Sequence, residues 1–176
     1  AFSAQSMFSF SNFYLNLAKY LNNDFQSFNT LLAENFYKIE DFEMSKKIYN
    51  QIKKKGSAYL WYAAKQNSNI LLKENKKEEA IELMSESFMK LTHKNLHDTF
   101  DFAEFLKRNK KYEIAIKYYT KIIESINETH PLYAKSMDGR GVVYERIGKW
   151  NLAEKDLLAS LNCLLYTSPS PRDATL

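Results

Sequence analysis

The sequence predicts an all-α protein built from repeated helical hairpins, and three observations support this fold class. Only four Gly and three Pro occur in 176 residues, so turns are few and helix is favoured. One helical segment recurs five times along the chain, with a period of about 34 residues that is typical of helical repeat proteins. Each copy also places a small residue between large ones at helical spacing, a pattern of close helix packing.

The recurring segment becomes visible when five stretches are aligned on that small residue, which we call the B anchor. The stretches are FSNFYLNLAKYL, FEMSKKIYNQI, KEEAIELMSESF, YEIAIKYYTKII and WNLAEKDLLASL, and their B anchors are Ser11, Ser45, Ala80, Ala115 and Ala153. Three residues before an anchor stands an aromatic or long side chain, and four residues after it stands a large apolar one. Because such positions share one helix face, each B anchor forms a notch into which a neighbouring helix can settle.

A partner helix is expected before each of the last four B anchors, at residues 26 to 39, 61 to 74, 96 to 108 and 134 to 147. Each partner carries a small residue twelve positions before its B anchor, which we call the A anchor; the four are Ala33, Ser68, Ala103 and Gly141. The connections IEDF, ENKK, RNKK and IGKW are short and polar, which favours antiparallel hairpins. Gly148 is expected to adopt the left-handed conformation at a helix end.

With these anchors in place, the sequence resembles the tetratricopeptide-repeat (TPR) family. In that family an aromatic, a Leu, a small residue and a Tyr follow one another on helix A, and an Ala, an aromatic and an Ala on helix B. The last repeat matches most closely, through Gly141, Tyr144, Gly148, Trp150, Ala153, Leu157 and Ser160. The other repeats are degenerate, and the Pro that often closes a repeat is replaced by Asn23, Ser57, Thr92 and Asn127. The resemblance covers residues 6 to 162 and implies an α-solenoid, a right-handed superhelix of antiparallel hairpins.

We therefore expect residues 1–162 to form one TPR-like α-solenoid, with a half-repeat at 6–24 and repeats at 26–57, 61–92, 96–127 and 134–162. The remaining residues, CLLYTSPSPRDATL, change composition abruptly and resemble a translated transposon-type sequencing adapter. We expect residues 163–176 to be a non-native tail and the rest to be a fragment of a longer solenoid. The uncapped last repeat then predicts self-association.

Composition and charge exclude several classes of function. The net charge is only +4, and the Lys residues alternate with acidic ones, which indicates a solvated surface rather than a nucleic-acid interface. A single cysteine, Cys163, excludes an internal disulfide, and no Cys/His spacing suits zinc. No apolar run reaches the roughly 20 residues of a membrane span. An abundance of Lys, Asn, Ile, Phe and Tyr suggests a bacterial, AT-rich genome, with the cytoplasm and the periplasm both open as compartments.

No catalytic, cofactor or metal site is predicted. His93 and His97 have the i, i+4 spacing that can bring two imidazoles together, but Asn95 and the repeat boundary are expected to break the helix between them. Glu78 and Glu79 lack a nucleophile or Gly-rich loop nearby and are expected to keep a helix soluble. Trp150 is expected to pack against a hairpin turn rather than to stack on a ligand.

The TPR resemblance also implies that the A helices line a groove in which a ligand peptide lies. Carried over by position, the groove candidates mix aromatic, basic and amide side chains. They are Tyr37, Lys38, Tyr62, Lys65, Asn69, Lys73, Phe100, Glu104, Lys107, Arg108, Lys135 and Arg146, and the same set of positions includes Glu34 and Asp138. This amphipathic and somewhat basic mixture would suit a peptide that carries acidic groups.

A more specific hypothesis is a clamp for a C-terminal carboxylate, which some TPR proteins possess. Lys65 and Asn69 fit its first pair of positions, but Asp101 and Gly139 occupy the later ones. An acidic group would repel the carboxylate, so the clamp is not expected.

Three interpretations of function stay open from the sequence. The favoured one is a protein–protein interaction scaffold that binds a peptide or partner subunit in its groove. In the second, the repeats are an arm of a larger bacterial enzyme or envelope-assembly protein whose catalytic part lies elsewhere. In the third, the groove side chains are ordinary solvated residues and the partner binds another surface.

Overall fold

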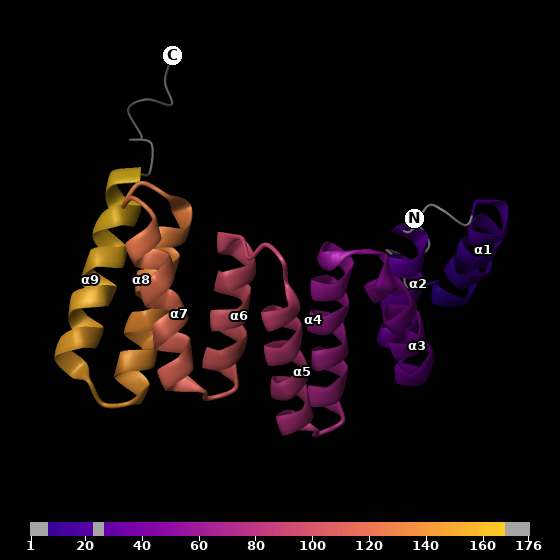
Figure 1. Ribbon diagram of the computed structural model, residues 1–176, viewed down its shortest axis with the longest axis horizontal. Helices are drawn as coiled ribbons and strands as arrows, with labels where there is room; N and C mark the ends of the chain where they lie inside the picture. The colour runs from indigo at the N-terminus through magenta and orange to yellow at the C-terminus, as the bar shows by residue number, and fades with distance from the viewer. Residues whose placement is uncertain (1–6, 23–26, 168–176) are drawn as a thin grey trace, which may run out of the picture. The chain divides into compact units, whose positions relative to one another are not determined.

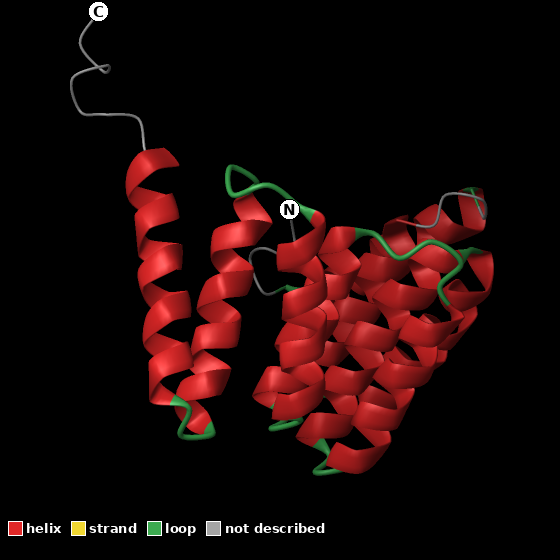
Figure 2. Ribbon diagram, turned by 60° about the vertical axis from the view of Figure 1, so that its left-hand side comes forward, coloured by secondary structure: helices red, strands yellow, loops and turns green. Residues whose placement is uncertain are grey.

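The computed structural model describes residues 7–22 and 27–167, and in that part of the chain all regular structure is helical (Figure 2). The helices are α1 (Phe8–Leu21), α2 (Ser27–Lys38), α3 (Phe42–Ile52), α4 (Ser57–Lys73), α5 (Lys77–Lys90), α6 (Leu96–Arg108), α7 (Tyr112–Ser125), α8 (Pro131–Arg146) and α9 (Trp150–Thr167), with a short 3₁₀ helix, η1 (Lys53–Lys55) (Figure 1). They fall into two compact units, residues 1–92 and 93–176, which are described separately.

Unit 1 contains two antiparallel hairpins, α2–α3 and α4–α5, and α1 packs against α2. Its core joins apolar residues of three helices, namely Leu32, Ala33, Ile48, Tyr49, Ile52, Ala63 and Ile70. A polar contact joins α1 to α2: the side-chain amide of Asn35 on α2 donates a 2.8 Å hydrogen bond to the hydroxyl of Ser11 on α1. Ser11 is the B anchor of α1, so α1 uses its notch face to meet α2.

Unit 2 repeats this architecture with the hairpins α6–α7 and α8–α9, and α7 packs against α8. The rings of Phe102 and Tyr118 meet edge to face at 5.1 Å between α6 and α7. A buried ion pair joins α8 to α9, where the Arg140 guanidinium donates to both oxygens of Asp156 at 2.6 and 3.0 Å. The same guanidinium donates to the Thr120 hydroxyl of α7 at 2.9 Å. One side chain thereby joins three helices of the unit.

The anchors predicted from the sequence lie at the closest approach within each hairpin. Three A anchors and three B anchors, Ala33, Ser68, Ala103, Ser45, Ala80 and Ala115, have no exposed surface. The Ser45 hydroxyl donates to the carbonyl of Ala33, the A anchor opposite it, at 2.9 Å. In the last hairpin a Cβ atom added to Gly141 would stand 2.9 Å from Cγ of Leu157. The prediction that small residues permit close helix crossing is confirmed.

All four hairpin turns share one geometry. The residue five positions before each B anchor has a positive φ: Glu40 (63°), Asn75 (62°), Lys110 (64°) and Gly148 (76°). In the α6–α7 turn, Lys110 N–H donates to the Lys107 carbonyl and Lys111 N–H to the Leu106 carbonyl, which is the Schellman arrangement. The prediction for Gly148 is confirmed. The other three turns hold a non-Gly residue in a conformation that costs about 1–2 kcal/mol for an L-residue.

Two helices begin earlier than predicted. Helix α4 begins at Ser57 rather than 61, so Ser57 opens a helix instead of closing the preceding repeat. Helix α8 begins at Pro131 rather than 134, because Pro at the first helical position lacks only an N–H that the helix does not use. His130 caps this helix, since its Nδ1 accepts a 3.1 Å hydrogen bond from the N–H of Leu132.

The last helix extends beyond the predicted repeat boundary at residue 162. Helix α9 continues to Thr167 and so includes the first part of the adapter-like segment; residues 168–176 lie outside the described part. Nothing between Asn162 and Thr167 breaks a helix by its type, because no Gly or Pro occurs there.

The prediction that Trp150 packs against a hairpin turn is wrong, because its side chain is 65% exposed. Phe42 occupies the equivalent position in α3 and is half-buried. It is covered by the ring of Tyr37 at 5.8 Å and by the ammonium of Lys73, from the following A helix, at 5.7 Å. This position in α3 is therefore covered partly by the A helix of its own hairpin and partly by the next hairpin, and α9 is the last helix in the described residues.

Candidate functional site

In unit 1, groove candidates from α2 and α4 lie together. The Tyr62 hydroxyl of α4 donates a 2.6 Å hydrogen bond to Oε1 of Glu34 on α2. The ring of Tyr49 meets Tyr62 edge to face at 5.9 Å, and burial, followed by the charge of Glu34, raises the Tyr49 pKa to about 12. The Lys73 ammonium lies over the Tyr37 ring at 4.6 Å. These polar and aromatic contacts lie between α2 and α4, the two A helices of unit 1.

The other unit 1 candidates are more dispersed. Lys38 lies over the ring of Phe8 on α1, and Lys65 lies over the ring of Trp61 on its own helix. Trp61 is buried against Phe88 at 5.6 Å between ring centroids and offers no face to a ligand. Asn69 is exposed. Lys38 and Lys73 stand in the last turns of α2 and α4, where a cation also complements the helix dipole.

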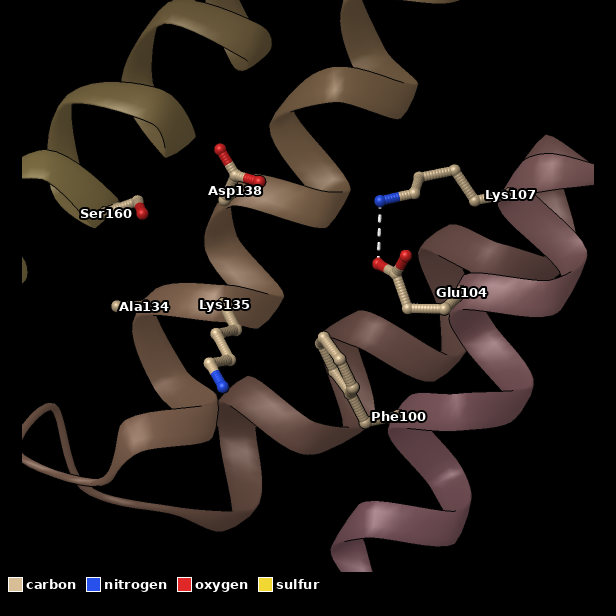
Figure 3. Close-up of a pocket in the computed structure, with 7 residues that line it drawn as sticks. All are labelled: Phe100, Glu104, Lys107, Ala134, Lys135, Asp138 and Ser160. Carbon is tan, nitrogen blue, oxygen red and sulfur yellow. Dashed lines mark hydrogen bonds and ion pairs between the residues drawn. The ribbon is translucent and has the colours of Figure 1, made fainter. Parts of the chain in front are cut away.

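Unit 2 contains a defined pocket of about 550 Å³ between its A helices, α6 and α8 (Figure 3). Its lining comes from α6, α8 and one residue of α9, namely Phe100, Glu104, Lys107, Ala134, Lys135, Asp138 and Ser160. Five of the positions predicted for the groove, Asp138 included, are therefore lining residues of one cavity. Arg108 and Arg146, which were also predicted, lie outside this lining.

The charge of Glu104 is compensated inside the pocket. Its Oε1 accepts a 2.6 Å contact from the Lys107 ammonium, drawn as the dashed line in Figure 3. The same oxygen accepts a short hydrogen bond from the Tyr119 hydroxyl of α7. Burial and then this hydrogen bond raise the Tyr119 pKa well above its ordinary value near 10, so Tyr119 remains a donor. The Phe100 ring meets Tyr119 edge to face at 6.1 Å, which positions the apolar side of the pocket.

The second pair of charges lies one helical turn apart on α8. Lys135 extends on the side of the pocket that Phe100 occupies, whereas Asp138 lies on the side of Lys107 (Figure 3). Both side chains are exposed, and Lys135 forms no ion pair with any described residue. The pocket thus presents an apolar ring beside a cation that no described residue neutralises through an ion pair.

The sequence-based prediction missed two tyrosines of the B helices beside the groove carboxylates: Tyr119 donates to Glu104, and Tyr49 packs on Tyr62, which donates to Glu34. Tyr49 and Tyr119 stand four residues after their B anchors and were interpreted only as large core groups. A signal was present, because Glu34 and Glu104 each directly follow the A anchor of the same two repeats. The other two repeats have neither the Glu nor the Tyr. A recurring Glu–Tyr pair in alternate repeats would have indicated a buried carboxylate contact.

The described residues give little support to a catalytic site or a metal site. Helix α5 ends at Lys90 and α6 begins at Leu96, so the predicted break between His93 and His97 is confirmed. Asn95 caps α6 by accepting a 2.8 Å hydrogen bond from the N–H of Asp98. Within the described ranges no group of three His, Cys, Asp or Glu side chains is arranged to hold a metal ion. In the same ranges, no helix combines the length and apolar character of a membrane span.

Comparison with known proteins identifies the fold through structure alone. No protein-family model matches the sequence, and no curated protein matches it either. Among solved structures, MamA is 13% identical with a TM-score of 0.65, and the match covers 94% of this chain and 93% of that one.

Two further structures agree with this result. YrrB, described as a TPR protein with an unusual peptide-binding site, is 13% identical with a TM-score of 0.59, over 92% of this chain and 80% of its own. The C-terminal part of a TPR repeat-containing protein from Cytophaga hutchinsonii is 15% identical with a TM-score of 0.63, over 92% of this chain and 62% of its own. The chain has the TPR fold, as the anchor pattern predicts.

Proposed function

We propose that this TPR-fold chain is a protein-interaction scaffold and that the pocket of unit 2 binds a peptide. The observation that carries the proposal is the cavity of about 550 Å³ between α6 and α8, in which the Phe100 ring stands beside the uncompensated Lys135 ammonium. A pocket lined by apolar surface with a few placed charges is the usual form of a ligand site. The peptide-binding site ascribed to YrrB supports the same use of the fold.

The charges of the pocket favour a particular peptide chemistry. Glu104 already has an ion pair with Lys107 and a hydrogen bond from Tyr119, so its charge does not require a cationic group on the ligand. Phe100 can receive an aromatic or large aliphatic side chain, and such ring pairs contribute roughly 0.5–1.5 kcal/mol beyond burial. Lys135 can receive a carboxylate. We therefore expect the bound peptide to carry an apolar residue next to Asp or Glu.

The test is selection of a displayed random-peptide library against the full chain, followed by fluorescence anisotropy with the enriched peptides. The proposal expects enriched peptides to pair an aromatic or Leu-like residue with an acidic neighbour. Phe100→Ala should weaken their binding about tenfold, because a truncated anchor residue commonly costs more than 1 kcal/mol. Lys135→Glu should weaken binding by at least as much, since it replaces attraction by repulsion.

A matched control separates the pocket from general surface charge. Lys117 is an exposed lysine on α7 and lies outside the pocket lining, so Lys117→Glu should leave peptide affinity unchanged. Peptides whose affinity responds equally to Lys117→Glu and Lys135→Glu would be bound by net charge alone. Enriched peptides that bind Phe100→Ala and Lys135→Glu as tightly as the parent chain would place the ligand elsewhere and refute the proposal.

A further inference from the structure

Helix α1 exposes an apolar stripe that its packing within unit 1 does not use. Phe13, Leu17, Tyr20 and Leu21 are 65%, 45%, 87% and 75% exposed. They recur at three- and four-residue intervals, so they share one face of the helix. Ser11, which meets Asn35 of α2, and Leu15, which packs against the core of unit 1, lie on another face. Helix α1 is thus apolar on two sides, although only one side packs against the other described helices of unit 1.

The other B helices show what this outer face ordinarily carries. Counted from the B anchor, the stripe occupies positions +2, +6, +9 and +10. In α3 and η1 these positions hold Lys47, Gln51, Lys54 and Lys55; in α5 they hold Glu82, Glu86, Met89 and Lys90; in α7 they hold Lys117, Lys121, Glu124 and Ser125. All twelve are exposed, and eleven are polar or charged. In α9 the positions hold Lys155, Ala159, Asn162 and Cys163, so a stripe of large apolar residues is particular to α1 among the described B helices.

The packing of a B helix against its own A helix does not account for the stripe. In the α2–α3 and α6–α7 hairpins this packing uses positions +3 and +7, as Ile48 and Ile52 are buried in the core of unit 1 and Tyr118 and Ile122 lie at the equivalent sites. The equivalent residues of α1 are Tyr14 and Ala18. An A helix packed against Tyr14 and Ala18 would leave the stripe from Phe13 to Leu21 exposed.

We propose that the α1 stripe is a self-association surface whose occupant is α1 of a second copy of this chain. With Phe10, which is 60% exposed, the stripe offers roughly 600 Å² when a full aromatic side chain is taken as about 200 Å². A standard stable interface buries about 800 Å² on each partner. The available area is thus close to what a dimer needs.

The charge of α1 also suits a pair of identical helices. The helix has no acidic residue, and its single base, Lys19, lies off the stripe, so pairing two stripes buries no unpaired charge. In an antiparallel arrangement the two Lys19 side chains stand at opposite ends of the pair. A membrane surface is the less suitable occupant, because interfacial helices are typically rich in Lys and Arg on their polar face.

Analytical ultracentrifugation of the full chain over a concentration series tests the proposal. The expected species is a dimer of the 20.7 kDa chain, and Tyr20→Glu should weaken self-association at least tenfold because it places a carboxylate in the apolar interface. Phe13→Ser provides a second, uncharged variant. Both side chains are largely exposed, so circular dichroism should show an unchanged helical fold in each.

Ile114→Glu is the matched control, because Ile114 is an apolar residue of α7 with 48% exposure outside the stripe, and this variant should remain dimeric. A parent chain that is monomeric at every concentration would overturn the proposal. A dimer that survives both α1 changes and dissociates with Leu161→Glu on α9 would assign the interface to the last repeat instead. A monomer that binds phosphatidylcholine vesicles and loses this binding with Tyr20→Glu would make lipid the occupant.

Discussion

Gly139→Ala is predicted to destabilise unit 2, although the same change in most helix interiors is stabilising. Helix α8 brings Gly139 against the side chain of Tyr119, and an added Cβ would stand 2.7 Å from two ring carbons and 2.9 Å from the hydroxyl. Since carbon atoms rest at about 3.5–4.0 Å, the ring would have to move by roughly 0.8 Å or more. The ring is held by its hydrogen bond to Glu104, which such a movement would strain.

The expected magnitude follows from opposing effects. Replacing Gly by Ala inside a helix stabilises by about 0.5–1 kcal/mol. Overpacking typically costs about 1–3 kcal/mol, and losing a hydrogen bond to a charged group costs roughly 1.5–3 kcal/mol. The net expectation is a loss of about 2–3 kcal/mol in the free energy of unfolding, measured by urea denaturation followed with far-ultraviolet circular dichroism.

A double-mutant cycle tests the stated cause. Tyr119→Leu removes the ring, so Gly139→Ala in that background should stabilise by about 1 kcal/mol, the helix-propensity effect alone. The reasoning is refuted if Gly139→Ala is neutral in the parent chain, or if it changes stability by the same amount in both backgrounds.

Three further predictions concern the turns, the buried ion pair and the tyrosines. Lys110→Gly should raise the free energy of unfolding by about 1 kcal/mol, because glycine adopts the left-handed conformation without strain. Lys117→Gly, in a helix interior, should lower it by a similar amount. Urea midpoints that move in the same direction for both variants would contradict this. Asp156→Ala should cost about 3 kcal/mol, since it leaves the Arg140 charge buried without its partner, and a thermal-denaturation midpoint within error of the parent would contradict it. Burial and Glu104 raise the Tyr119 pKa. Above about pH 10 the unfolded chain therefore releases a proton that the folded chain retains, and the free energy of unfolding should fall as pH rises. Tyr119→Phe should reduce the slope of unfolding free energy against pH in the alkaline range.

The hairpin fold could be predicted because its main determinant is the size of single residues. Ala33, Ala103 and Ala115 sit where two backbones nearly touch, and a larger side chain there would overlap its neighbour. That constraint allows almost no substitution, so it remains visible when the rest of the repeat has diverged.

The turn geometry was predictable at only one position of four. Gly148 indicates a left-handed residue by its type, whereas Glu40 and Lys110 do not. These residues are held in place by the two hydrogen bonds of the turn and by the packing on either side. Tertiary context therefore overrides the local preference, and a residue-by-residue interpretation has no access to that context.

The candidate site could be predicted by position but not by electrostatic state. The A-helix register identifies groove positions, and five of the pocket residues follow from it: Phe100, Glu104, Lys107, Lys135 and Asp138. It does not reveal that Glu104 is compensated by Lys107 and Tyr119 while Lys135 is not. Such differences depend on side-chain distances of a few ångströms, which the repeat period alone does not specify.

The shared turn geometry has a consequence for how this chain can change length. Twelve residues separate the A anchor from the B anchor in every hairpin, whereas the interval from a B anchor to the next A anchor is 22 residues from Ser11 to Ala33, then 23 twice, and then 26 from Ala115 to Gly141. The loops α5–α6 and α7–α8 have the same length, because α5 ends at Lys90 and α6 begins at Leu96 while α7 ends at Ser125 and α8 begins at Pro131. The extra residues therefore lie in the first turn of α8, before Gly141. Each hairpin thus keeps one anchor-to-anchor length, and the repeat varies in length only between one hairpin and the next.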